Sequence, residues 1–160
     1  MSSEPRSSRI EARLAELGLS VPIAPTPAAN YIPWVRTGNL VYIAGQVPMK
    51  GGEFRWVGKV GRDWTLEEGK EAAREVALNV LSQLKTALDG DLDRVVRAVK
   101  LNGFVNSTDD FIMQPAVING ASELMIEVFG EAGRHARSAV GVAQLPFGVA
   151  VEIDGVFEVR

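Results

Sequence analysis

The sequence predicts an α+β protein in which two helices cover one face of a mixed β-sheet. Two long stretches, residues 65–88 and 114–130, repeat apolar residues at the 3.6-residue period of a helix. The other apolar stretches are short and end at turn residues, as strands do. The order is three strands, a helix, a strand, a helix and two strands, which is typical of helices packed on a sheet. The 160 residues fit one domain with its own core.

Residues 1–28 are expected to form an extension, a short helix followed by a proline-rich strap, before the main domain at residues 29–160. Three apolar residues lie on one stripe of a helix, namely Ile10, Leu14 and Leu17. Gly18 is placed to end this helix. Prolines at positions 22, 25 and 27 then favour an extended chain that crosses the domain.

Residues 31–46 change to the pattern of a β-hairpin. The turn at 37–39 joins the predicted strands Ile32–Arg36 and Leu40–Gln46. A second turn, rich in glycine, leads into a strand near Glu53–Val57. A further strand, rich in valine, is expected at Val95–Phe104.

Both long helices carry start and stop signals. Thr65 and Glu68 form a capping box, in which each side chain accepts a hydrogen bond from a free backbone N–H at the helix start. This helix is expected to run to about Leu88. The second is expected to begin near Gln114, where a proline suits the first turn, and to end at Gly130.

The last thirty residues are predicted to form a hairpin of the strands Ser138–Gln144 and Val149–Val159. Pairing across its turn puts Gly141 opposite Glu152, and opposite residues share a face. The face for the helices would carry Val140, Val142, Val151, Ile153 and Phe157. The other face combines charged and small residues, namely Arg137, Ala139, Gly141, Ala143, Ala150, Glu152, Asp154 and Val156. Small residues allow a ligand or another subunit to approach the backbone.

Arg137 and Glu152 are the candidates for chemistry on this second face. The guanidinium of Arg137 is a planar donor suited to a carboxylate. Glu152, when partly desolvated, could orient or deprotonate a water molecule. Their positions are expected about 13 Å apart along the strands, a span that a small substrate could bridge. The alternative is that both are ordinary charged residues, at a strand end and at a sheet edge.

Composition and charge exclude several classes of protein. The chain has no cysteine, which excludes disulfides, cysteine-based metal sites and a cysteine nucleophile. Its formal net charge is −3 and its basic residues are scattered, which disfavours nucleic-acid binding. No apolar stretch has the length of a membrane span, and residues 1–8 are too polar for a signal peptide. A cytoplasmic location is expected, since the absence of cysteine suits a reducing compartment.

Two segments resemble a known family. Residues 136–146, ARSAVGVAQLP, followed by VEI at 151–153, resemble the C-terminal signature of the RidA/YjgF family (reactive intermediate deaminase A). Residues 38–48, GNLVYIAGQVP, resemble the family's segment around its Gly-Gln pair. The resemblance covers about residues 29–160. The extension before it is similar to a longer branch, often labelled endoribonuclease L-PSP or translation inhibitor.

The resemblance implies a chorismate-mutase-like fold assembled as a homotrimeric barrel, with sites in the clefts between subunits. It implies hydrolysis of enamines or imines such as 2-aminoacrylate to keto acids and ammonia, without metal or organic cofactor. By position, Arg137 would hold the substrate carboxylate and Glu152 would position the attacking water. The Gly45 backbone would contact the substrate, Tyr31 would line the pocket, and Asn119 of the neighbouring subunit would close it.

Two expected substrate-binding positions depart from the family pattern. Ala44 stands where deaminase-type members often have serine, and Ala139 where many have cysteine. These changes leave the substrate open and allow a larger or more apolar imine. They also motivate one alternative function, a trimeric regulatory protein that binds small carboxylates without turnover. A less favoured alternative, which does not depend on these two positions, is an endoribonuclease or translation inhibitor.

The remaining signals are interpreted structurally. His135 is the only histidine and is interpreted as a surface residue, because one histidine cannot supply a usual metal site. The glycines at 51–52 and 58–61 lack the spacing of a phosphate loop. The three tryptophans are interpreted as packing or interface residues rather than a platform for stacked bases.

Overall fold

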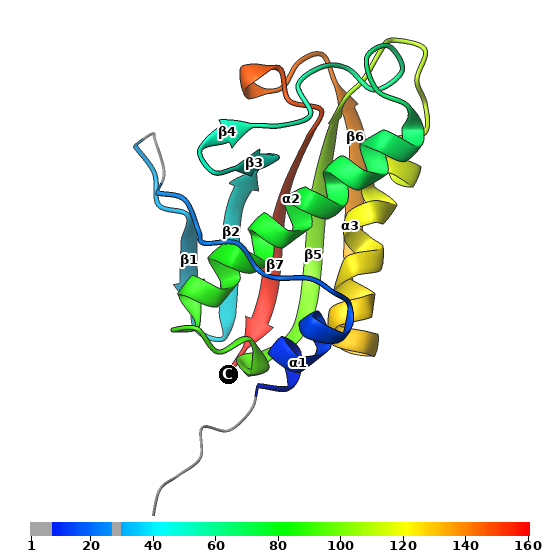
Figure 1. Ribbon diagram of the computed structural model, residues 1–160. Helices are drawn as coiled ribbons and strands as arrows, with labels where there is room; N and C mark the ends of the chain where they lie inside the picture. Colours follow the sequence, from blue (N-terminus) through cyan, green and yellow to red (C-terminus); the bar gives the residue numbers. More distant parts are fainter. Residues whose placement is uncertain (1–7, 27–29) are drawn as a thin grey trace, which may run out of the picture.

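The computed structural model describes residues 8–26 and 30–160, and it has the predicted two layers of helices and sheet (Figure 1). Five strands form a mixed sheet in the order β1-β2-β7-β5-β6. They are β1 (Trp34–Thr37), β2 (Leu40–Gln46), β7 (Val151–Val159), β5 (Val95–Asn106) and β6 (Ala136–Val142). A separate two-stranded ribbon follows β2 and consists of β3 (Met49–Lys50) and β4 (Glu53–Phe54).

Two long helices, α2 (Leu66–Ala87) and α3 (Gln114–Phe129), pack against one face of the sheet, as predicted (Figure 1). The capping box of α2 is confirmed: Thr65 Oγ1 accepts from the Glu68 N–H at 3.2 Å, and Glu68 Oε2 accepts from the Thr65 N–H at 2.8 Å. α3 has proline in its first turn and ends at Gly130. The helices form one core with apolar residues of the sheet, including Val41, Leu101, Ile153 and Phe157.

The predicted hairpin of the last two strands is wrong, because β5 lies between β6 and β7. Gly103 of β5 is beside Ala139 in a parallel pairing with β6 and beside Ile153 in an antiparallel pairing with β7. β5, α3 and β6 form a βαβ unit, since parallel neighbours need a crossover connection. The segment between β6 and β7 contains the short 3₁₀ helix η3 (Pro146–Gly148) instead of a hairpin turn.

This topology reverses the predicted faces of β6. Phe104 is beside both Val140 and Glu152 in register, so these three side chains share the face away from the helices. Val140, predicted for the core, is 46% exposed on this open face. Val142, two residues along the same strand, points the same way.

Arg137 lies on the helix side of the sheet. It aligns with Leu101, whose side chain is buried in the core. The prediction that Arg137 and Glu152 project from the same face is therefore wrong within one chain. The two-residue period of a strand correctly predicted which residues of β6 share a face. Because β6 pairs with β5 instead of β7, however, each face was assigned to the wrong side of the sheet.

The helix predicted at the start of the chain is confirmed as α1 (Arg9–Glu16). It buries Ile10 and Leu14 in the core. Asp93 holds its first turn, because the carboxylate accepts hydrogen bonds from the Ser8 hydroxyl and from the N–H groups of Arg9 and Ile10. Burial by itself would raise the pKa of Asp93, but these hydrogen bonds hold that pKa below its ordinary value.

The strap after α1 is tied to α2 by side chains that bond to its backbone. Ser82 Oγ donates to the Pro22 carbonyl at 2.7 Å, and Gln83 Nε2 donates to the Pro25 carbonyl at 3.4 Å. In Figure 1 this segment crosses α2 on the side away from the sheet. Pro27 and the expected boundary between residues 28 and 29 lie outside the described residues.

Some strand limits differ from the prediction. β1 begins at Trp34 instead of Ile32, and the strand expected near Glu53–Val57 is limited to the two residues of β4. Within the described ranges, no helix combines the length and the apolar character needed to cross a membrane.

Candidate functional site

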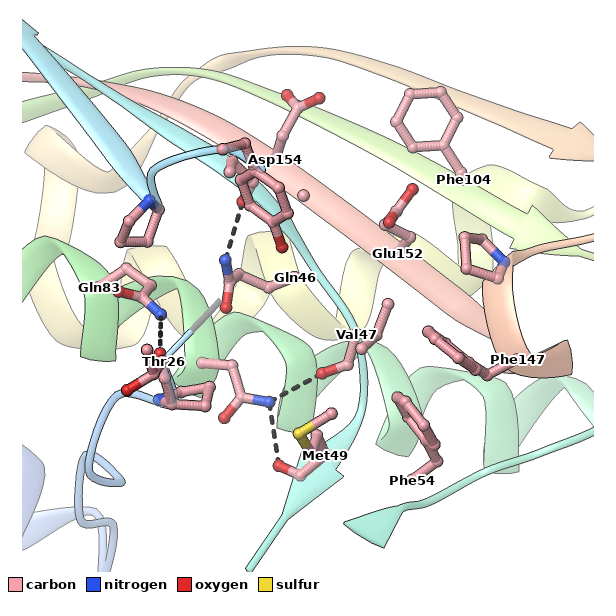
Figure 2. A pocket seen from close by; sticks show the side chains of 17 residues that line it. Thr26, Gln46, Val47, Met49, Phe54, Gln83, Phe104, Phe147, Glu152 and Asp154 are labelled. Carbon is pink, nitrogen blue, oxygen red and sulfur yellow. Dashed lines mark hydrogen bonds between the residues drawn. The ribbon is translucent and has the colours of Figure 1, made fainter. Parts of the chain in front are cut away.

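A cavity of about 730 Å³ opens beside the last residues of β2 (Figure 2). The strap, the segment before β1, the β3–β4 ribbon, α2, η3 and the open face of the sheet also contribute to its walls. Four predicted site residues line it, namely Tyr31, Ala44, Gly45 and Glu152. Arg137, Asn119 and Ala139 are not among its lining residues.

A β-bulge shapes the end of β2. Ile43 pairs with Gly155 and Gln46 pairs with Ile153, so β2 has one residue more than β7 between these pairs. The two residues in this stretch are Ala44 and Gly45. A Cβ at Gly45 would lie 3.0 Å from Glu152 Cδ and 3.1 Å from Oε1. Glycine therefore allows the Glu152 carboxylate to lie against the backbone here.

Two carboxylates give the cavity a negative charge. Glu152 and Asp154 alternate on β7 and point to the same open face. Asp154 Oδ1 accepts a hydrogen bond from Asn102 Nδ2 at 2.7 Å, whereas no described residue donates one to Glu152. Burial, and then the charge of Asp154, raises the pKa of Glu152 above its ordinary value. Neither lysine nor arginine is among the described lining residues, so the cavity favours positively charged ligands.

Aromatic side chains form the wall beside Glu152. Phe54 of β4 and Phe147 of η3 stack with ring centroids 4.3 Å apart, and Phe104 is beside Glu152 in register. Phe147 is 70% exposed and has φ 60° and ψ 14°, a left-handed conformation that residues other than glycine rarely adopt. The sequence predicted a turn at Phe147 but no role for the three phenylalanines, because only the fold brings β4, β5 and η3 together.

Arg137 contacts α3 on the other side of the sheet. Its Nη1 donates to Asn119 Oδ1 at 2.8 Å and to Ser122 Oγ at 3.1 Å. These two residues are three apart on one helix face, a spacing visible in the sequence. Among the described residues, Arg137 has no carboxylate within ion-pair distance. Neutral groups therefore orient the guanidinium, and its charge is available to a ligand.

His135 extends this network, so its interpretation as a surface residue is wrong. Nδ1 lies 2.6 Å from the Gly133 carbonyl oxygen, which requires the ring proton on Nδ1. Nε2 is then the acceptor for the Ser122 hydroxyl at 2.9 Å, and the Ser122 oxygen accepts from Arg137. Burial, assisted by the charge of Arg137, lowers the pKa of His135 below its ordinary value. The neutral ring that this network needs is thereby favoured.

In one chain, the two halves of the predicted site do not meet. Arg137 is two strands away from Gly155, which is three residues from Glu152 along β7. These offsets separate the positions of Arg137 and Glu152 by about 14 Å, on opposite faces. Ala139 lies on β6 and packs against the core. The described residues also contain no cluster of three or more His, Cys, Asp or Glu side chains suited to a metal ion.

The five-stranded sheet, its β5–α3–β6 crossover and the bulged strand beside Glu152 define a YjgF-type α+β protein. The family described as "YjgF/chorismate mutase-like, putative endoribonuclease" matches residues 11–152. The chain therefore belongs to the YjgF/RidA family, and the resemblance in its sequence is confirmed.

Similar proteins include both uncharacterised and enzymatic relatives. Protein TCP17 of Trypanosoma cruzi is 51% identical over 155 residues, which are 96% of this chain and 96% of the relative. A 2-iminobutanoate/2-iminopropanoate deaminase of Dermatophagoides farinae is 31% identical over 138 residues, 86% of this chain and 92% of the relative. The crystal structure of Atu1372, a protein of unknown function from Agrobacterium tumefaciens, is 50% identical with a TM-score of 0.88, over 94% of this chain and 92% of that one.

Proposed function

We propose that this protein hydrolyses 2-imino acids, or the enamines that convert to them, to 2-keto acids and ammonia. The oxygen of a water molecule adds to C2 of the protonated imine, and the C2–N bond then breaks. Protons from the water and its adduct pass to the leaving nitrogen, so the products are a 2-keto acid and an ammonium ion. The reaction needs one group to hold the carboxylate and one to move protons at C2.

The charges of the two half-sites match such a substrate. A protonated 2-imino acid is positive at nitrogen and negative at its carboxylate. Glu152 and Asp154 supply negative charge without a basic neighbour among the described lining residues. Arg137 supplies a positively charged guanidinium group, whose hydrogen-bond partners Asn119 and Ser122 are neutral. This complementarity is the observation that carries the proposal.

The two half-sites require a second copy of the chain. Arg137 and Glu152 lie on opposite faces of the sheet, and a head-to-tail association that joins these two faces forms a closed ring when its rotation allows. A homotrimeric ring would contain three equivalent sites. Arg137 would then act with Asn119 and Ala139 of its own chain on a substrate bound beside Glu152 of the neighbour.

Glu152 is proposed as the residue that accepts a proton from the attacking water. Its raised pKa makes it a stronger base than an exposed glutamate. Because Gly45 has no side chain, the Glu152 carboxylate can lie close to the backbone of β2. The deaminase of D. farinae supports this reaction class, as a relative that acts on 2-iminobutanoate and 2-iminopropanoate by name.

The test is release of ammonia and keto acid from enzymatically generated 2-imino acids. Wild type should accelerate their hydrolysis, and Arg137→Ala should not, with the oligomer checked by light scattering. Equal activity in an Arg137→Ala protein that keeps the wild-type assembly would refute the proposal.

A second candidate function is binding of small carboxylates without turnover. It is favoured by Ala44, which leaves this part of the cavity wall without a hydroxyl group. It predicts that 2-keto acids raise the melting temperature through Arg137 while no imine is consumed. RNA cleavage is less compatible with the site, because Glu152 and Asp154 would repel phosphate and His135 lies in the other half-site.

A further inference from the structure

The cavity extends beyond the space that a very small imino acid needs. 2-Iminopropanoate has six non-hydrogen atoms and displaces at most about 180 Å³, at ~30 Å³ for each atom counted as a water. The cavity measures about 730 Å³, inside the 300–1,000 Å³ range of sites for larger organic ligands. Roughly three-quarters of the volume in the single chain therefore remains for a larger side chain, for solvent and for the groups that the neighbouring copy contributes.

The part of the cavity beside Glu152 is apolar. We call it the phenylalanine lobe, and it consists of Val47, Phe54, Phe104, Pro146 and Phe147. Figure 2 shows Phe54 and Phe147 stacked against each other. Phe104 is beside Glu152 in register, and Val47 lines the same cavity. None of these side chains carries a charge or a hydrogen-bonding group, so burial of apolar ligand surface is the interaction they offer.

The backbone at Phe147 shows that its position is imposed by the surrounding structure. A left-handed conformation at a phenylalanine is unfavourable, and it persists only where neighbouring contacts determine it. The ring is nevertheless 70% exposed in the single chain, and its stacking partner is Phe54. The ring lines the same cavity as Glu152, and exposed apolar surface that is kept there at a conformational cost is typical of a binding surface.

We propose that the phenylalanine lobe binds the apolar side chain of the substrate, and that the preferred substrates are 2-imino acids as large as those from leucine, methionine or phenylalanine. This inference rests on the proposed function and assigns its substrate class. Phe54 and Phe147 determine specificity, while Arg137 and Glu152 act on the common part of every substrate.

The test compares kcat/KM for the imino acids generated from leucine and from alanine. Phe147→Asn is the informative variant, because asparagine tolerates the left-handed conformation and removes the apolar ring. Phe147→Tyr keeps the ring and should behave as wild type. Ile23→Asn is the matched control, since Ile23 is 97% exposed on the strap and does not line the cavity.

Wild type should prefer the leucine-derived substrate at least tenfold, within the range that apolar pockets achieve. Phe147→Asn should reduce this preference at least fivefold, and Ile23→Asn should leave it unchanged. The lobe assignment is overturned if Phe147→Asn lowers kcat/KM equally for both substrates, or if it dissociates the oligomer. In either case activity on imino acids would leave the proposed function standing.

If wild type hydrolyses no imino acid, the proposed function fails. The binding of keto acids then tests whether the phenylalanine lobe accepts an apolar side chain. The probes are then 4-methyl-2-oxopentanoate and pyruvate, measured by their effect on the melting temperature. A larger stabilisation by the longer keto acid that is lost in Phe147→Asn supports the lobe. Equal effects of the two acids, or a difference that persists in Phe147→Asn, overturn it.

Discussion

Arg137 and Glu152 carry opposite charges in contrasting surroundings. Arg137 is held by a hydrogen-bond network complete within one chain, through Asn119, Ser122 and His135. Glu152 lies in an open cavity, and no described residue donates a hydrogen bond to it. A single chain therefore fixes the direction of the cation, whereas its described residues leave the anion without a basic partner in the cavity.

The largest expected effect comes from inactivating one half-site in each of two variants and then mixing the variants. Glu152→Gln should lower kcat about 10²–10⁴-fold, the usual contribution of a general base, and Arg137→Ala should abolish turnover. Chains of both variants refolded together in equal amounts should recover about one quarter of wild-type activity, because half of the sites receive an intact arginine and half of those an intact glutamate. Ammonia release from the purified mixed oligomer measures this.

A mixing control separates sites between chains from sites within one chain. Wild type refolded with an equal amount of the double variant Arg137→Ala, Glu152→Gln should keep about one quarter of its sites if they lie between chains, and about one half if they lie within chains. Recovery of no activity from the two single variants, or a value near one half in the control, contradicts the composite site.

Gly45→Ala should have the next largest effect. Its Cβ would press on the far end of the flexible Glu152 side chain, at 3.0 Å from Cδ, so the carboxylate must move while the backbone need not. A displacement of this kind should lower kcat about 10–100-fold. Steady-state kinetics measure the loss, and thermal unfolding should change little. A fully active Gly45→Ala protein would show that the position of this carboxylate is unimportant.

A smaller effect is expected at His135, which orients Arg137 through Ser122. His135→Asn should lower kcat/KM about threefold to tenfold, the worth of one neutral hydrogen bond. Because the folded-state pKa of His135 is lowered, the unfolded chain binds its proton first, and stability should fall as the pH drops below about 6.5. Melting temperatures between pH 5 and 7 should show this decline in wild type and a weaker one in His135→Asn.

The smallest expected effect is a change in the thermal stability of the protein when Glu152 is replaced by glutamine. Its folded-state pKa is raised, so ionisation costs the folded state free energy above the pKa of the unfolded chain, and the cost is absent below it. Glu152→Gln should therefore raise the melting temperature at neutral pH by about 1–3 °C even though it lowers kcat. Glu53→Gln, at an exposed position on β4, is the control and should not change it. A lower melting temperature in Glu152→Gln would contradict the cost of burying this charge.

The local signals in the sequence predicted the elements well. The capping box at Thr65 and Glu68 depends on residues three apart, and the stripe of α1 on residues four apart, so neighbouring positions contain the whole signal. The resemblance likewise identified Tyr31, Ala44, Gly45 and Glu152, which the structure brings to one cavity. It also identified Arg137 and Asn119, which the structure brings into contact.

Patterns within the sequence were enough to predict the helices, the strands, the family and the candidates for each half-site. The position of β5 between β6 and β7, which places Arg137 and Glu152 on opposite faces, became known only from the fold. A strand's two-residue period states which side chains share a face, whereas the neighbour of an edge strand depends on how a helix crosses over the sheet. For the same reason the phenylalanine lobe, which joins β4, β5 and η3, has no signal in any one segment.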